Sequence, residues 1–133
     1  MMLSEPPAGS SASSACGGAN VFRKDCPSRR VLEMLAEKWA LMLMHLLAEG
    51  PRRTSQLRRA IEGVSEKMLI QTLRRLERAG FVERHAFAEV PPRVEYRLTE
   101  LGLSLGETIK PLDTWIERHL ADVQAAQARF DAK

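Results

Sequence analysis

The segment from Ser65 to Gly80 constrains this chain more than any other, because its ends and its two faces can be read from the residues. Ser65 can cap the start of a helix, Glu66 places negative charge in its first turn, and Gly80 can end it. At about 100° per residue, three leucines share one face, and basic and amide side chains lie opposite them. We therefore predict a helix that buries one face and exposes a basic one. The apolar set is Leu69, Leu73 and Leu76, and the polar set is Lys67, Gln71, Arg74, Arg75 and Arg78.

A charged helix face is usually only solvated, so the meaning of this basic face depends on what precedes it. Leu57 and Ile61 stand four residues apart and predict a short helix, with Thr54 or Ser55 as its cap. The turn that follows, residues 62–64, contains a glycine and leads directly into the basic helix. Two short helices joined by such a turn are typical of a helix-turn-helix, which places its second helix in the major groove of DNA.

Two segments with alternating apolar and polar residues follow the basic helix. They are residues 81–87 and 94–98, and a loop with two prolines, residues 88–93, separates them. This pattern predicts a two-stranded hairpin, the wing of a winged helix-turn-helix, and we expect no third strand. Arg93 lies at the expected tip, where it could reach a phosphate or the minor groove, although an exposed loop arginine is also commonplace.

The distribution of charge agrees with a nucleic-acid partner. The net charge of the 133 residues is only +3, but residues 51–97 hold eleven Lys and Arg against six Glu, a local charge of +5. No run is apolar enough to span a membrane, and no secretory signal opens the sequence, so we expect a cytoplasmic protein. No nucleophile elbow, phosphate loop or metal-binding spacing is found, so we expect neither an enzyme nor a cofactor.

The part of the chain before the helix-turn-helix divides into two regions. Residues 1–20 are rich in Ser, Ala, Gly and Pro, so we expect a disordered tail. From residue 25 to 49, apolar residues recur at helical spacing, but periodicity leaves open whether one helix forms or two that meet near Glu37. Cys16 and Cys26 provide no disulfide framework, and in a reducing compartment we expect both to rest as thiols.

A long helical pattern closes the chain. Thr99 can cap it, and Pro111 is expected to kink or restart it. Its apolar stripe is longer than a small domain can cover, which favours a subunit interface, with packing on the chain's own domain as the alternative. We assign residues 21–125 to the DNA-binding domain with this dimerisation helix and expect residues 126–133 to fray. The expected interface residues are Leu112, Trp115, Ile116 and Leu120.

Several short motifs between residues 26 and 120 have the spacing of one bacterial regulator family. They are Cys26-Pro27, Lys38-Trp39, SEKML at 65–69, QTL at 71–73, EVPPRVEY at 89–96 and LTELG at 98–102. With these motifs the chain resembles the HxlR family of transcriptional regulators. The resemblance implies a homodimer that binds double-stranded DNA and controls nearby genes. Two departures are Glu37, where the family usually has glycine, and Arg53-Thr54, where it often has an aromatic residue.

The expected fold is mainly α with a small β-hairpin, a winged helix-turn-helix with a C-terminal dimerisation helix. Glutamine can pair with adenine and arginine with guanine, so the basic helix is expected to read base edges, while the helix cap and the wing contact phosphates. The expected DNA-contacting residues are Thr54, Ser55, Ser65, Lys67, Gln71, Thr72, Arg74, Arg75, Arg78 and Arg93.

The resemblance also implies a means of regulation. Some members sense oxidants or electrophiles through a cysteine that is followed by proline near the start of the domain, as Cys26 is here. Lys24, Arg29 and Arg30 lie close by, and a nearby helix N-terminus would also stabilise a thiolate. The cysteine could instead be buried and inert, with a small-molecule inducer as the signal, or the chain could be an interaction module that does not bind DNA. Repression is the expected sign of regulation.

Overall fold

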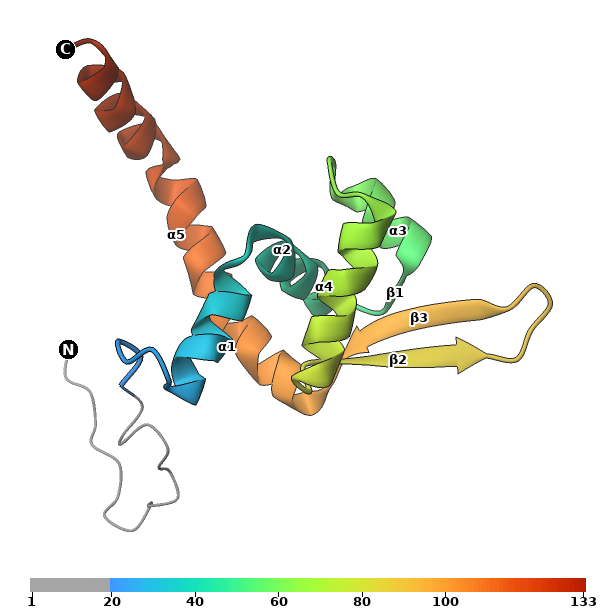
Figure 1. The fold of residues 1–133 in the computed structure, drawn as a ribbon. Helices are drawn as coiled ribbons and strands as arrows, with labels where there is room; N and C mark the ends of the chain where they lie inside the picture. The colour runs from blue at the N-terminus through green and yellow to red at the C-terminus, as the bar shows by residue number, and fades with distance from the viewer. Residues whose placement is uncertain (1–19) are drawn as a thin grey trace.

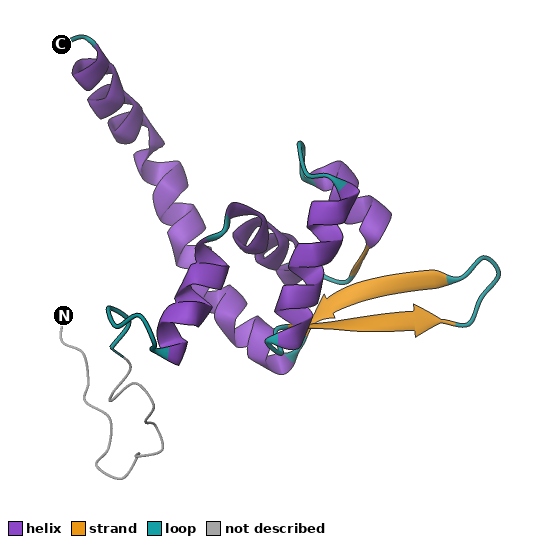
Figure 2. Cartoon of the chain, in the orientation of Figure 1, coloured by secondary structure: helices purple, strands orange, loops and turns teal. Residues whose placement is uncertain are grey.

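The computed structural model describes residues 20–133, so the expected tail and Cys16 lie outside the described residues. The prediction of a mainly helical fold with a small sheet is confirmed (Figures 1 and 2). In chain order the elements are α1 (Pro27–Ala36), α2 (Lys38–Ala48), β1 (Arg52–Arg53), α3 (Thr54–Ala60), α4 (Glu66–Arg78), β2 (Val82–Phe87), β3 (Arg93–Leu98) and α5 (Glu100–Asp131).

Two helices, and not one, precede the helix-turn-helix. Glu37 has an extended backbone, with φ of −71° and ψ of 131°, which ends α1 and starts α2. Its amide donates a hydrogen bond to the Met34 carbonyl. Periodicity left open whether one helix or two form here. The extended backbone of Glu37 divides the segment into two helices.

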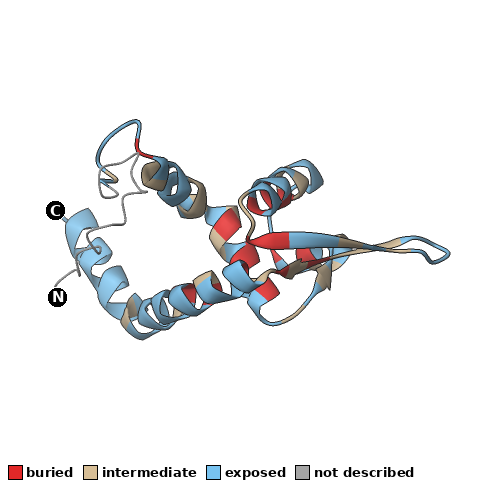
Figure 3. Cartoon of the chain, turned by 90° about the horizontal axis from the view of Figure 1, so that it is seen from below, coloured by how far each residue is buried: buried red, intermediate tan, exposed pale blue. Residues whose placement is uncertain are grey.

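The core lies where α2 and α4 meet the sheet (Figure 3). Leu43 and Met44 of α2 are completely buried there, as are Leu57 of α3 and the three leucines of α4. Burying each such side chain stabilises the fold by about 1.5–3 kcal/mol. These contacts fix the position and orientation of α3 relative to α4, as a helix-turn-helix requires.

The sheet has three antiparallel strands in the order β1-β3-β2. The ladder of β2 and β3 runs from the pair Val82 and Leu98 to the pair Phe87 and Arg93. The prediction that no third strand exists was wrong, because β1 pairs Arg52 with Tyr96 on the other edge of β3. A strand of two residues is too short to show alternation, so only the paired structure reveals it.

The start of α5 packs closely on the end of the helix-turn-helix. The Thr99 hydroxyl accepts a hydrogen bond from the Gly102 amide at 3.0 Å, which confirms the predicted cap, and donates one to the Gly80 carbonyl at 2.5 Å. A Cβ on Gly102 would overlap the carbonyl oxygen of Phe81. The absence of a side chain at this position therefore sets how closely α5 approaches the wing.

The structure decides between the two alternatives at Pro111 and corrects one expectation about the end of α5. The helix does not restart at Pro111, which lies inside a continuous assignment, although α5 bends along its length (Figures 1 and 3). A proline inside a helix removes one backbone hydrogen bond and can bend the helix without ending it. The expected fraying from residue 126 is also absent, because helix extends to Asp131. Alanine, glutamine and arginine, which dominate residues 124–129, have high helix propensity.

Candidate nucleic-acid interface

The predicted boundaries of the basic helix are confirmed in α4. Oγ of Ser65 accepts a hydrogen bond from the Met68 amide at 3.1 Å, which makes Ser65 the N-cap. After the last residues of the helix, Gly80 has a φ of +87°. Glycine adopts this left-handed conformation without the steric penalty that other residues meet, so it can turn the chain from α4 into the wing.

The two faces of α4 differ as the sequence predicts. Leu69, Leu73 and Leu76 have no exposed surface. The five polar side chains opposite them are exposed, and among residues 20–133 none of their four cations forms an ion pair within 4 Å. The face therefore presents positive charge that no carboxylate of this part of the chain neutralises. Its residues are Lys67, Gln71, Arg74, Arg75 and Arg78.

Thr72 does not belong to this face, so its expected DNA contact is corrected. Its side chain is 1% exposed, and its hydroxyl donates a hydrogen bond to the Met68 carbonyl at 2.8 Å. Helical geometry places residue 72 beside Leu69 and Leu76, a signal that the sequence already carried. Thr72 is part of the buried face of α4.

The start of α3 differs by one residue from the prediction. Arg53 is the N-cap, and its amide donates a hydrogen bond to Oε1 of Gln56 at 2.8 Å. Thr54 and Ser55 are consequently the first two residues of the helix and not its cap, because the backbone of Arg53 still belongs to β1. Ser55 is exposed and Thr54 half-buried at this helix end.

Arg93 is held within the wing. Its Nη2 lies 3.2 Å from Oε2 of Glu89, its Nη1 lies 3.7 Å from Oε2 of Glu95, and its Cζ lies 4.3 Å from the ring centroid of Phe87. It is the last residue of the ladder and not the tip of the loop. Its guanidinium therefore already has two carboxylates and an aromatic ring as partners within the wing.

Cys26 is buried, which is one of the two alternatives that the sequence left open. It is the N-cap residue of α1, before Pro27 at the first helical position, as predicted, and it is completely buried. The structure has it disulfide-bonded, so the expectation that Cys26 rests as a thiol was wrong for this state. A cysteine without exposed surface reacts only when its surroundings open.

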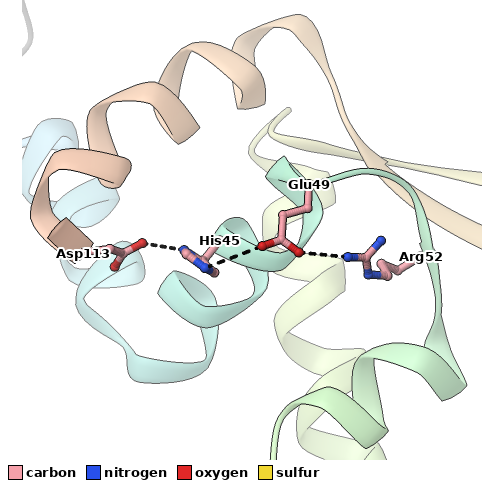
Figure 4. Close-up of polar contacts among 4 residues, drawn as sticks. All are labelled: His45, Glu49, Arg52 and Asp113. Carbon is pink, nitrogen blue, oxygen red and sulfur yellow. Dashed lines mark hydrogen bonds and ion pairs between the residues drawn. The ribbon is translucent and has the colours of Figure 1, made fainter. Parts of the chain in front are cut away.

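A set of polar contacts that sequence reasoning missed connects α5 to the sheet (Figure 4). His45 Nδ1 on α2 lies 2.5 Å from Asp113 Oδ2 on α5, and His45 Nε2 lies 4.0 Å from Glu49 Oε2. Glu49 Oε1 in turn lies 3.0 Å from Nη2 of Arg52 in β1. Because His45 and Asp113 are far apart in sequence, only the packing of α2 on α5 brings them together.

The four residues expected at a dimer interface are exposed in the single chain. Their exposed fractions are 45% for Leu112, 52% for Trp115, 47% for Ile116 and 47% for Leu120. Leu112 and Ile116 also line a cleft against α2 and the end of α3. Beyond this contact, the C-terminal part of α5 projects away from the other elements (Figure 1). So much apolar surface on one helix is unusual for a monomer.

A cleft of about 660 Å³ adjoins this stripe, between α2, the end of α3 and α5. Its walls are mainly apolar, and its polar groups include the His45 and Asp113 pair. Within residues 20–133 no group of His, Cys, Asp and Glu side chains could hold a metal ion, and no helix is long and apolar enough to cross a membrane. The apolar walls are formed by Leu41, Met42, Leu46, Ile61, Ile109, Leu112 and Ile116.

The structure has a helix-turn-helix whose second helix carries cations without ion-pair partners among residues 20–133, and a hairpin follows it. These features define a winged helix-turn-helix protein. A family model described as HxlR-like helix-turn-helix matches residues 34–124. The chain belongs to this family of transcriptional regulators, as its motifs suggested, and the family and its relatives are not enzymes.

Named relatives agree with this assignment. The HTH-type transcriptional regulator YtfH of Escherichia coli (strain K12) is 47% identical over 108 residues, which is 81% of this chain and 86% of YtfH. The solved structure of the regulator ytfH from Salmonella typhimurium has a TM-score of 0.78 at 43% identity, and the match covers 83% of this chain and 98% of that one. The redox regulator HypR in its oxidised form has a TM-score of 0.66 at 34% identity, covering 70% and 96% of the two chains.

Proposed function

We propose that the chain is a homodimeric repressor that binds a specific operator in DNA, with α4 in the major groove. The observation that carries this proposal is the exposed face of α4, whose cations lack carboxylate partners among residues 20–133. A folded protein that carries unpaired positive charge beside a helix-turn-helix has the chemistry to neutralise phosphates. A DNA-bound dimer of this size would repress by occluding a promoter.

The residues of α4 are assigned separate roles. Lys67, Gln71, Arg74 and Arg75 are proposed to reach base edges, because amide and guanidinium groups can make paired hydrogen bonds to adenine and guanine. Arg78, near the end of the helix, and Ser55, at the start of α3, are proposed to contact phosphates. Ser65 is proposed to approach the backbone while it caps α4.

The experiment is a fluorescence anisotropy titration of the purified full chain on the DNA upstream of its own gene. A scrambled fragment of equal length is the control. Preference for the upstream DNA by about a thousandfold or more is expected for a specific regulator. Equal affinity for both fragments would contradict the proposal and favour a protein-interaction module.

The dimer is proposed from the apolar stripe of α5. A helix with Trp115 and Ile116 exposed gains stability when a second copy covers it, because aromatic and aliphatic side chains dominate subunit interfaces. Two copies related by a twofold axis would place their α4 helices on half-sites about 34 Å apart. Sedimentation equilibrium at micromolar concentration should give a mass of two chains, and a single-chain mass would contradict the dimer.

A thiol switch at Cys26 is proposed as the means of control. Support comes from its place at the N-terminus of α1 and from the similarity to HypR, which is a redox regulator by name. Starting from the reduced chain, oxidation of the Cys26 thiol and a second thiol to a mixed or intersubunit disulfide, with hydrogen peroxide taking up the two electrons and two protons as water, would change the spacing of the two α4 helices. DNA binding should then differ between the reduced and the oxidised chain, and Cys26→Ser should remove the difference.

The cleft beside α5 favours a second candidate, control by a small ligand without a thiol. Its volume of about 660 Å³ and its apolar walls are typical of small-molecule sites. DNA binding that is insensitive to oxidants but lost when an apolar ligand is added would support this candidate over the thiol switch.

A further inference from the structure

The wing contains three arginines, Arg84, Arg93 and Arg97; Arg97 is half-buried, and the other two are in different situations. We propose that they divide two tasks: Arg93 is a positioning residue that closes the wing, and Arg84 is the wing residue that contacts a DNA phosphate. The proposal rests on DNA binding by the proposed function and replaces the phosphate contact expected of Arg93.

Three groups hold the guanidinium of Arg93. They are the carboxylates of Glu89 and Glu95, at 3.2 and 3.7 Å, and the ring of Phe87, at 4.3 Å. Phe87 is also its partner across the ladder, so the stacked pair closes the last rung before the loop. The Glu89 amide donates to the Phe87 carbonyl at 2.9 Å, which adds a turn at the same place.

The charges around Arg93 disfavour a phosphate. Two carboxylates surround one guanidinium, so this part of the wing carries a net negative charge. A phosphate that approached Arg93 would also approach Glu89 and Glu95, whose charges repel it. Freeing the guanidinium would break two ion pairs and a cation–π contact. Both effects oppose a role of Arg93 as a phosphate ligand.

Arg84 and Arg93 lie on opposite faces of the sheet. Residues paired across an antiparallel ladder share a face, and successive residues alternate between faces. Arg84 pairs with Tyr96 and therefore shares the face of the buried Val82 and Leu98, against which the core packs. Arg93 pairs with Phe87 and lies on the opposite face.

Arg84 has the properties of a phosphate ligand. It is exposed, it lies on the edge strand β2, and no ion pair within 4 Å engages it in residues 20–133. The turn at Gly80 joins its strand β2 to the end of α4, and the two elements contact each other. An arginine there without an ion pair can join the basic residues of α4 in contacting one DNA duplex.

The test compares Arg84→Ala, Arg93→Ala and Arg93→Lys in the full chain, titrated onto labelled upstream DNA at several salt concentrations. Loss of one phosphate contact lowers the slope of log K against log salt by about 0.9. We expect this change for Arg84→Ala only. Arg93→Ala should keep the slope and weaken binding about two- to fivefold, and Arg93→Lys should not restore it, since lysine keeps the charge but loses the planar stacking.

Hydrogen exchange of the free proteins separates this proposal from DNA binding itself. Amides of residues 83–97 should exchange faster in Arg93→Ala than in the parent chain, and Arg84→Ala should leave them unchanged. Unchanged exchange in Arg93→Ala would overturn the positioning role even if no DNA bound. A lowered salt slope in Arg93→Ala, restored by lysine, would also overturn it, and an unchanged slope in Arg84→Ala would overturn the phosphate contact. Failure of the parent chain to bind DNA would instead refute the proposed function.

Discussion

Nδ1 of His45 lies 2.5 Å from Oδ2 of Asp113, and this contact joins the central helix α2 to the helix proposed for dimerisation (Figure 4). From His45 the contacts continue through Glu49 to Arg52 at the start of the sheet. A movement of α5 against α2 would therefore disturb side chains that lead to β1 and to the start of α3.

Replacing Asp113 should weaken this attachment. The side chains of His45 and Asp113 are half and one-third exposed, so solvent screens their interaction. We expect Asp113→Ala to lower the free energy of unfolding by about 0.5–1 kcal/mol in urea denaturation at fixed protein concentration. Glu117→Ala, at an exposed carboxylate on the same helix, is the control. Equal changes in the two variants would show that the contact contributes nothing.

The two buried glycines of α5 should respond to alanine in opposite ways. Gly102→Ala places a methyl group on the Phe81 carbonyl oxygen, and we expect a loss of about 1–3 kcal/mol of stability in thermal or urea unfolding. At Gly106 the nearest atoms to a new Cβ are Ala48 Cβ at 3.6 Å and Leu98 Cδ1 at 3.7 Å, which is ordinary contact. Gly106→Ala should therefore gain up to about 1 kcal/mol from helix propensity. A stable Gly102→Ala variant would contradict the close approach of α5 to the wing.

Truncation of Trp115 tests the proposed interface. The ring is 52% exposed and stacks on His119 at 4.5 Å between centroids, so it is presented as a rigid surface. Loss of a central aromatic residue commonly removes about 2 kcal/mol or more of binding energy, so Trp115→Ala should raise the dimer dissociation constant roughly thirtyfold. Lys110→Ala, on another face of α5, should leave it unchanged. If sedimentation gave the same constant for Trp115→Ala and the parent, the interface would lie elsewhere.

The sequence predicts the helix-turn-helix well because the signals for its helices and turns are local. The cap at Ser65, the leucine spacing of α4 and the turn at Gly80 each depend on residues within one or two turns. The same holds for the cap at Thr99. Short-range rules of helix geometry are sufficient for such features.

The features that the sequence did not predict depend on partners far along the chain. The two residues of β1 become a strand only because β3 offers a free edge. His45 meets Asp113 through the packing of two helices, and Arg93 meets Phe87 through strand register. Thr72 is a different case, since the spacing from Leu69 already indicated its burial.

The exposed face of α4 is proposed to read DNA sequence, and the neighbours Gln71 and Thr72 test this central claim most directly. Anisotropy titrations should compare Gln71→Ala, Thr72→Val and the parent chain on upstream and scrambled DNA. We expect Gln71→Ala to lose about 1–3 kcal/mol of preference for the upstream DNA, since one base contact is removed, and the buried Thr72→Val to keep the preference. Equal losses on both DNAs for Gln71→Ala, or a loss of preference in Thr72→Val alone, would contradict the claim.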